Sequence, residues 1–203
     1  GDVYKRQGHD EVQQLLDRLA DSAPKLVEDL IPGVLPLGVL VSVLQNLLRE
    51  GVPIRDLRTI VETLALHAPK SQEPDALTAA VRVGLGRYIV QHFNGLEGEM
   101  PVITLDPTLD QILHQTLQNN EESRVALEPN LAERIYKGLR ESANQQEVAG
   151  EPALLLVADG LRPLLAKMAR QAADQVRVLA FSEVPEHLQL RVVSTIGRTE
   201  SLE

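Results

Sequence analysis

Residues 41–70 read VSVLQNLLREGVPIRDLRTIVETLALHAPK and contain two apolar stripes at helical spacing. The members of the stripes are Val41, Leu44, Leu47 and Leu48 in the first, and Ile54, Leu57, Ile60, Val61 and Leu64 in the second. Gly51 is a stop signal between them, and Pro53 stands where a second helix can begin. The stretch therefore predicts a helix-turn-helix unit, in which a turn of about three or four residues joins two helices.

The sequence on both sides of this unit also favours helices. Apolar residues at helical spacing predict one helix from His9 and another over residues 76–91. Gly84 and Gly86 lie inside the second of these, where they either permit close helix packing or bend the helix. Residues 1–7 fit no pattern and are interpreted as artificial or disordered sequence. The first half of the chain is thus expected to be helical.

The second half has a different pattern, which begins after the Gly- and Glu-containing residues 94–100, the best candidate for a domain boundary. Short runs rich in branched apolar residues predict four strands, at residues 101–105, 153–158, 176–182 and 188–196. The second run is apolar throughout, as in a strand that is buried on both faces. With helices between them, the runs predict a small α/β sandwich and an α+β fold for the whole chain.

Polar and alternating residues add detail to this second half. Asp106 and Asp159 follow predicted strands and are expected to cap the helices that come next. In the last strand the residues alternate, which predicts that Leu190, Val192 and Ile196 share one side of it, opposite Gln189, Arg191 and Thr195.

The composition is that of a globular, acidic protein: 203 residues, 43% hydrophobic, 24% charged and a net charge of −9. The acidic residues are spread over both halves, so general binding to nucleic acid phosphates is not expected. There is no Cys, which excludes disulfides and thiolate metal sites. The sequence shows no secretory signal or membrane span, and because it begins without Met we expect it to be a fragment.

No residue pattern indicates catalysis. The five His residues include no pair at the spacing of a metal site, and there is no Walker A sequence or Ser nucleophile elbow. The sequence therefore predicts no catalytic, cofactor-binding or metal-binding residue. Arg55, Asp56 and Arg58 lie on the exposed side of the second helix of the helix-turn-helix. They are either a protein-contact surface or a solvated face, because residues 54–67 carry no net charge for binding DNA.

Several long blocks, in the same order along the chain, resemble the C-terminal cytoplasmic domain of the FlhA/InvA family of type III secretion export-gate proteins. The blocks are GHDEVQQLLDRLADSAPKLVEDLIPG, VLQNLLREGVPIRDLRTIVETLALHAPK, LTAAVRVGLGRYIV, PALLLVADGLRPLLAKMARQ and FSEVPEHLQLRVVSTIG. The resemblance extends over residues 8–197, and the last blocks are more similar to the flagellar branch than to the virulence branch. It implies a non-enzymatic scaffold for ring assembly at the cytoplasmic face of the bacterial inner membrane.

The resemblance also implies subdomains and partners. Residues 8–26 would end an upstream subdomain, 27–98 would form a helical winged-helix-like subdomain, 99–197 an α/β subdomain and 198–203 a tail. The partners implied are other copies of the chain in a ring, chaperone–substrate complexes, and stalk and ATPase components of the flagellar export apparatus, with membrane contact only through a part absent from this sequence.

Two other readings stay open from the residues alone. A winged-helix regulator with an α/β effector domain would bind duplex DNA weakly at low salt. An α/β enzyme with a nucleotide ligand would gain thermal stability from that nucleotide.

Overall fold

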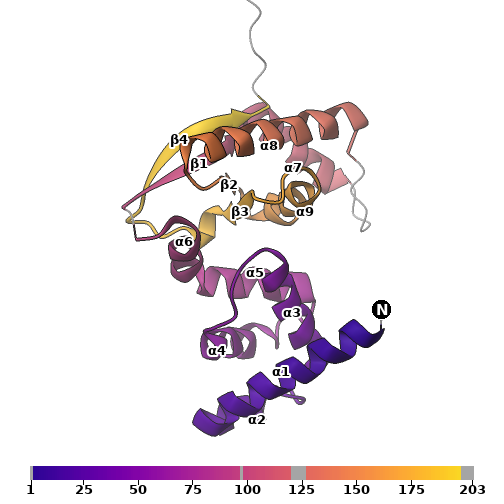
Figure 1. Ribbon diagram of the computed structural model, residues 1–203. Helices are drawn as coiled ribbons and strands as arrows, with labels where there is room; N and C mark the ends of the chain where they lie inside the picture. Colours follow the sequence, from indigo (N-terminus) through magenta and orange to yellow (C-terminus); the bar gives the residue numbers. More distant parts are fainter. Residues whose placement is uncertain (1, 97, 120–126, 198–203) are drawn as a thin grey trace, which may run out of the picture. The chain divides into compact units, whose positions relative to one another are not determined.

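The computed structural model describes residues 2–96, 98–119 and 127–197, with side chains from His9 onward, so the predicted tail at 198–203 lies outside the described residues. The chain divides into two compact units, residues 1–89 and 90–203 (Figure 1). We call them the helical unit and the α/β unit and describe each by itself.

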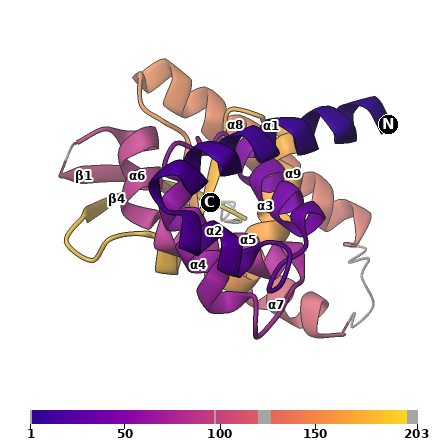
Figure 2. The same ribbon diagram turned by 90° about the horizontal axis from the view of Figure 1, so that it is seen from below.

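The helical unit contains α1 to α5 and the beginning of α6. Their bounds are α1 Asp2–Ser22, α2 Pro24–Leu30, α3 Leu37–Arg49, α4 Leu57–His67, α5 Pro74–Gly84 and α6 Gly86–Asn94. Helix α1 starts seven residues before His9, in a segment for which no helix is predicted from the sequence. Both views place α1 beside α2 and α3 (Figures 1 and 2). The core is mainly leucine and valine, because the sequence offers few aromatic residues.

The helix-turn-helix stretch forms α3 and α4, but the second helix begins later than expected. Gly51 ends α3 as predicted, with a positive φ of 75° that suits glycine. The prediction that a new helix begins at Pro53 is wrong, because the first helical bond runs from Ile60 N to Asp56 O. The Asp56 side chain accepts a hydrogen bond from Thr59 N at 3.1 Å and thereby caps α4.

Gly84 and Gly86 were expected either to permit close helix packing or to bend the helix, and the structure shows both effects. Helix α5 ends at Gly84 and α6 starts at Gly86, so the predicted single helix is interrupted between them. A Cβ atom on Gly84 would also lie 2.9 Å from Thr63 Oγ1, which makes this glycine a close packing point between α5 and α4.

The α/β unit contains one parallel sheet, which confirms the predicted mixed fold with four strands. Its elements are β1 Glu99–Leu105, α7 Pro107–Asn119, α8 Pro129–Ala149, β2 Leu154–Val157, the 3₁₀ turn η1 Asp159–Leu161, α9 Arg162–Ala172, β3 Arg177–Ala180, the 3₁₀ turn η2 Phe181–Glu183 and β4 Gln189–Ile196. The strand order is β3-β2-β1-β4, and β2 is buried along its whole length, as predicted. One face of the sheet packs against α7, α8 and α9 through Ile103, Leu139 and Leu165.

A register shift changes which side chains of β4 are buried. Val192 pairs with Val102, but Ser194 pairs with Ile103, so β4 carries an extra residue at this point. The prediction that Leu190, Val192 and Ile196 share one side of the strand is therefore wrong. Ile196 is 2% exposed, whereas Leu190 and Val192 are 46% and 59% exposed.

The two aspartates after strands have different roles. Asp106 caps α7 as predicted, since its carboxylate accepts a hydrogen bond from Thr108 N at 3.1 Å. Asp159 does not cap α9: it opens the turn η1 and accepts a hydrogen bond from Ser182 N at 3.2 Å. That contact joins the segments that follow β2 and β3.

Candidate protein-contact surfaces

The helical unit presents Arg55, Asp56 and Arg58 at the start of α4, and all three are exposed. The Asp56 carboxylate is held by Thr59, as described above. Arg58 Nε lies 3.0 Å from Glu62 Oε1 one turn further along the helix. Two of the three side chains are thus oriented by bonds within α4.

These residues line a groove of about 520 Å³ between α1 and the start of α4. We call it the arginine groove. Its apolar lining comes from Leu15 and Leu19 of α1 together with Ile54 and Leu57, and Arg18 of α1 joins the polar lining. The groove therefore combines an apolar floor with charged edges, an arrangement suited to a protein segment more than to a small polar substrate.

The charges of the arginine groove are mostly positive. Arg18, Arg55 and Arg58 stand against a single lining carboxylate, Asp56, although Glu62 offsets part of the charge of Arg58. The sequence did not indicate Arg18, because periodicity within α1 says nothing about which helix lies beside it. The surplus of cations favours an acidic, partly apolar partner.

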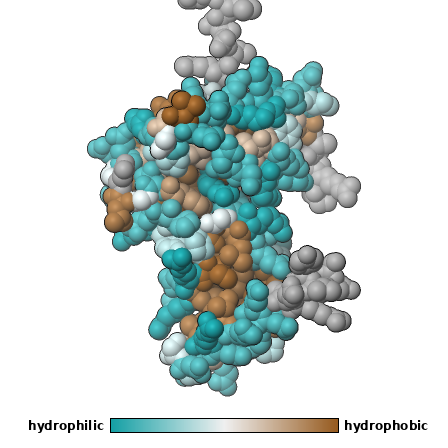
Figure 3. All heavy atoms as spheres, in the orientation of Figure 1, coloured by the Kyte–Doolittle hydropathy of each residue, from teal (hydrophilic) through white to brown (hydrophobic). Residues whose placement is uncertain are grey.

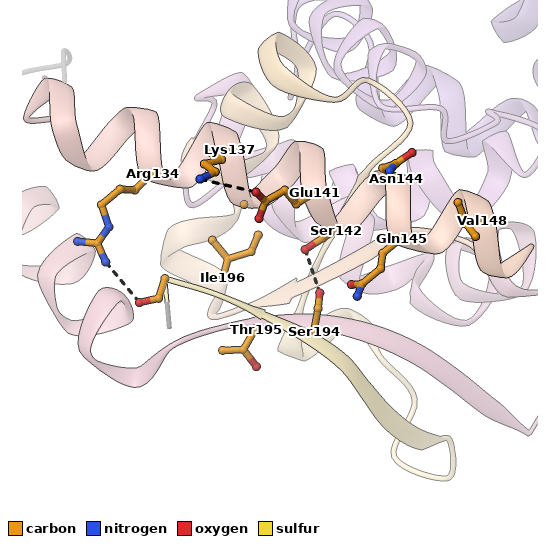
Figure 4. A pocket seen from close by; sticks show the side chains of 12 residues that line it. Arg134, Lys137, Glu141, Ser142, Asn144, Gln145, Val148, Ser194, Thr195 and Ile196 are labelled. Carbon is orange, nitrogen blue, oxygen red and sulfur yellow. Dashed lines mark hydrogen bonds and ion pairs between the residues drawn. The ribbon is translucent and has the colours of Figure 1, made fainter. Parts of the chain in front are cut away.

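The α/β unit has a second groove, of about 670 Å³, between α8 and β4. We call it the α8–β4 groove. Figure 4 shows side chains from α8 on one side and the end of β4 on the other. Ser142 Oγ and Ser194 Oγ lie 2.9 Å apart across it, and Arg134 donates a hydrogen bond to Gly197 O at 3.4 Å. Lys137 Nζ lies 3.8 Å from Glu141 Oε1 along the helix.

Beside this groove, Arg191 of β4 forms ion pairs with Glu151 and Glu99. These carboxylates raise the pKa of the Arg191 guanidinium above its ordinary value, mainly because the guanidinium donates side-chain hydrogen bonds to Glu151 and to Glu99. The cation of β4 is thus tied to β1 and to the segment that precedes β2.

Exposed apolar side chains form further surface features. Figure 3 shows a largely hydrophilic surface interrupted by separate hydrophobic patches. Large apolar side chains with high exposure include Leu66, Val148, Phe181, Leu190 and Val192.

Among the described residues, no group of three or more His, Cys, Asp or Glu side chains could hold a metal ion. Within the described part of the chain, no helix is both long enough and apolar enough to cross a bilayer.

Comparison with known proteins gives relatives for almost the whole chain. Flagellar biosynthesis protein FlhA of Yersinia enterocolitica is 49% identical over 190 residues, an alignment that covers 94% of this chain and 27% of that protein. The chain therefore spans little more than a quarter of the length of this relative.

Solved structures agree with this similarity. The Chlamydia pneumoniae CdsV protein, in a complex with CdsO, has 26% identity and a TM-score of 0.84, with 93% of this chain and 55% of that chain covered. The nonameric EPEC SctV-C structure has 28% identity and a TM-score of 0.81, with 93% and 56% covered. A family model described as the FHIPEP family matches residues 4–189. This chain, which carries an arginine groove on a helical unit and a second groove on a parallel α/β unit, belongs to the FHIPEP family.

Proposed function

We propose that this chain is a cytoplasmic part of a flagellar type III protein export gate and acts as a non-catalytic scaffold. Its 49% identity to a flagellar biosynthesis protein supports the flagellar assignment. The nonameric state of the similar SctV-C supports ring assembly, and the complex of CdsV with CdsO supports the docking of a second protein. Both lines of support come from relatives that are longer than this chain.

In this proposal the chain contains parts of three subdomains of the longer protein. Residues 27–98 would be the winged-helix-like subdomain and residues 99–197 the α/β subdomain, with residues 8–26 as the end of the preceding one. The partners would be other copies of the chain, chaperone–substrate complexes, and stalk and ATPase components. The longer protein would hold these residues at the cytoplasmic face of the inner membrane.

The observation that carries the scaffold role is the arginine groove. Its apolar floor gives a partner segment surface to bury, and Arg18, Arg55 and Arg58 favour carboxylates on that segment. We propose that the groove, including Asp56 at its edge, is a contact surface between copies of the chain. The net charge of −9 means that another copy can supply the acidic segment.

The test is charge reversal in the full-length natural protein. Arg18→Glu combined with Arg55→Glu should reduce export of flagellar substrates about tenfold or more, because two attractive contacts become repulsive. Arg87→Glu, at an exposed position of α6 outside the groove, is the matched control and should export normally. Cross-linking between copies measures assembly in the same cells.

Two results would contradict the proposal at different levels. Normal export and normal cross-linking in the double variant would show that the arginine groove is not the contact surface. Normal export after deletion of residues 27–98 would overturn the scaffold role itself.

A further inference from the structure

We propose that the outer edge of β4 binds an extended, acidic segment of a partner protein as an additional strand, with the α8–β4 groove holding its side chains. The proposal concerns the α/β unit alone and does not depend on self-association through the arginine groove. It rests on the geometry of the sheet edge, on the side chains beside it and on the charge of the groove.

Strand β4 ends the sheet, since the strand order is β3-β2-β1-β4. Along its inner side β4 pairs with β1 over its whole length. Gln189 N, at the start of β4, donates to Gly98 O, and Asp106 N, just after β1, donates to Ile196 O at the end of β4. No strand of the described residues pairs with its outer side. An edge of this kind is a template for another strand.

The usual protections of an edge strand are weak here. Natural edges are kept short or carry charged side chains and prolines that oppose pairing. Strand β4 has eight residues, contains no proline, and its only charged side chain is Arg191. Because Arg191 is tied to Glu99 and Glu151, it is drawn toward the sheet and away from the open edge. The extra residue at Val193 interrupts the edge but leaves residues on both sides of it.

The two faces beside the edge offer different chemistry. Val192 pairs with Val102, and Ser194 with Ile103, so Val192 and Ser194 lie on opposite faces. Leu190 and Val192, which are 46% and 59% exposed, offer apolar surface on the face away from α8. On the other face the α8–β4 groove offers Ser194 and amide side chains of α8. An added strand with alternating apolar and polar residues would match both faces.

The α8–β4 groove matches such a segment in length and is complementary to it in charge. Its α8 lining runs from Arg134 to Val148, about 21 Å of helix at 1.5 Å per residue. An extended chain covers this distance with about six residues. The charged lining consists of Arg134, Lys137 and Glu141, so cations exceed carboxylates near the Gly197 end. That surplus favours acidic residues at one end of the bound segment.

The first experiment uses a defined probe and the whole chain. The probe is a fluorescein-labelled peptide of nine residues that alternates valine with threonine and ends in two glutamates. We expect saturable binding by fluorescence anisotropy, and slower amide exchange at Leu190 and Val192. A peptide with proline at alternate positions lacks the N–H groups of a strand and should not bind. Absence of binding by the first peptide, or equal binding by both, would overturn the proposal.

Variants then locate the site. Leu190→Lys combined with Val192→Lys should weaken binding about tenfold or more, which corresponds to about 1.4 kcal/mol. Both positions are exposed, so the fold should persist, and circular dichroism checks this. Leu66→Lys, at a residue that is 68% exposed in the helical unit, is the matched control and should bind like the parent chain. Equal loss in both variants, or no loss in either, would contradict the edge as the site.

Two further tests concern the preference of the groove for an acidic segment, and whether the added strand comes from a partner protein or from a second copy of the chain. Arg134→Gln with Lys137→Gln should weaken binding up to about fivefold per charge and reduce its salt dependence, whereas Arg140→Gln on α8 outside the groove should not. Sedimentation distinguishes a second copy as occupant. If the parent chain dimerises and Leu190→Lys with Val192→Lys makes it monomeric, the edge serves self-association and the proposal of a partner segment is wrong.

Discussion

Gly138 of α8 shows how one missing side chain can set the distance between a helix and a sheet. A Cβ atom at this position would lie 2.7 Å from Ile196 Cγ2 of β4, closer than carbon atoms approach. Replacing Gly138 by Ala should improve helix propensity by about 1 kcal/mol. It should also overpack the contact at a cost of about 1–3 kcal/mol. We expect a net loss of about 1 kcal/mol in the free energy of unfolding, measured by urea denaturation.

Two further variants make the Gly138 prediction specific. Gly160→Ala has open space around the new Cβ atom and should change the free energy of unfolding by less than about 0.5 kcal/mol. In an Ile196→Ala background the overpacking is relieved, so Gly138→Ala should become neutral or stabilising. If Gly138→Ala alone makes the chain more stable, the close approach is not a constraint.

Single residues are also where prediction from sequence was least complete. The position of Arg55, Asp56 and Arg58 on an exposed side followed from the stripe of apolar residues in α4. Their neighbour Arg18 did not, because it comes from a helix nearly forty residues earlier in the sequence. Gly138 carries no local signal either, since only the position of Ile196 makes its missing side chain necessary.

At the level of elements, the start of α4 depends on one cap. Asp56→Ala removes the acceptor for Thr59 N and should lower the free energy of unfolding by about 0.5–2 kcal/mol. Glu73→Ala is the control, because Glu73 occupies the same position before α5 without a side-chain cap bond. Thermal and urea unfolding of both variants provide the measurement. Equal stability of the two would refute the capping role of Asp56.

The helices and strands themselves were largely predictable. The residues at which they begin, and the face of the strand on which each side chain lies, were not. Runs of apolar residues located all four strands, because branched residues between turn signals form strands in most contexts. The alternation predicted for β4 holds as far as Val192 and is reversed beyond it, because an extra residue in a strand exchanges the two faces of the residues that follow. Pro53 failed as a helix start because a carboxylate three residues later offered a better cap. Such outcomes depend on pairing across the fold, which local patterns do not contain.

On the scale of the molecule, the two compact units suggest that the α/β unit is an independent folding unit. The described members of its core cluster run from Ile103 to Ile196, all within the α/β unit. A chain of residues 86–203 keeps the whole of α6 and is long enough for a core of its own. We expect it to unfold cooperatively in urea and to give dispersed amide signals in NMR spectra.

The same fragment separates the two grooves. It contains β4 and α8 but neither Arg18 nor Arg55, so it should bind the valine–threonine peptide with the affinity of the whole chain. Arg134→Gln with Lys137→Gln should weaken this binding in both chains by the same factor, because the groove residues all lie within the fragment. A folded fragment that bound the peptide about tenfold more weakly than the whole chain would mean that the helical unit contributes to the site. Failure of the fragment to unfold cooperatively would instead show that the core of the α/β unit is not sufficient for folding.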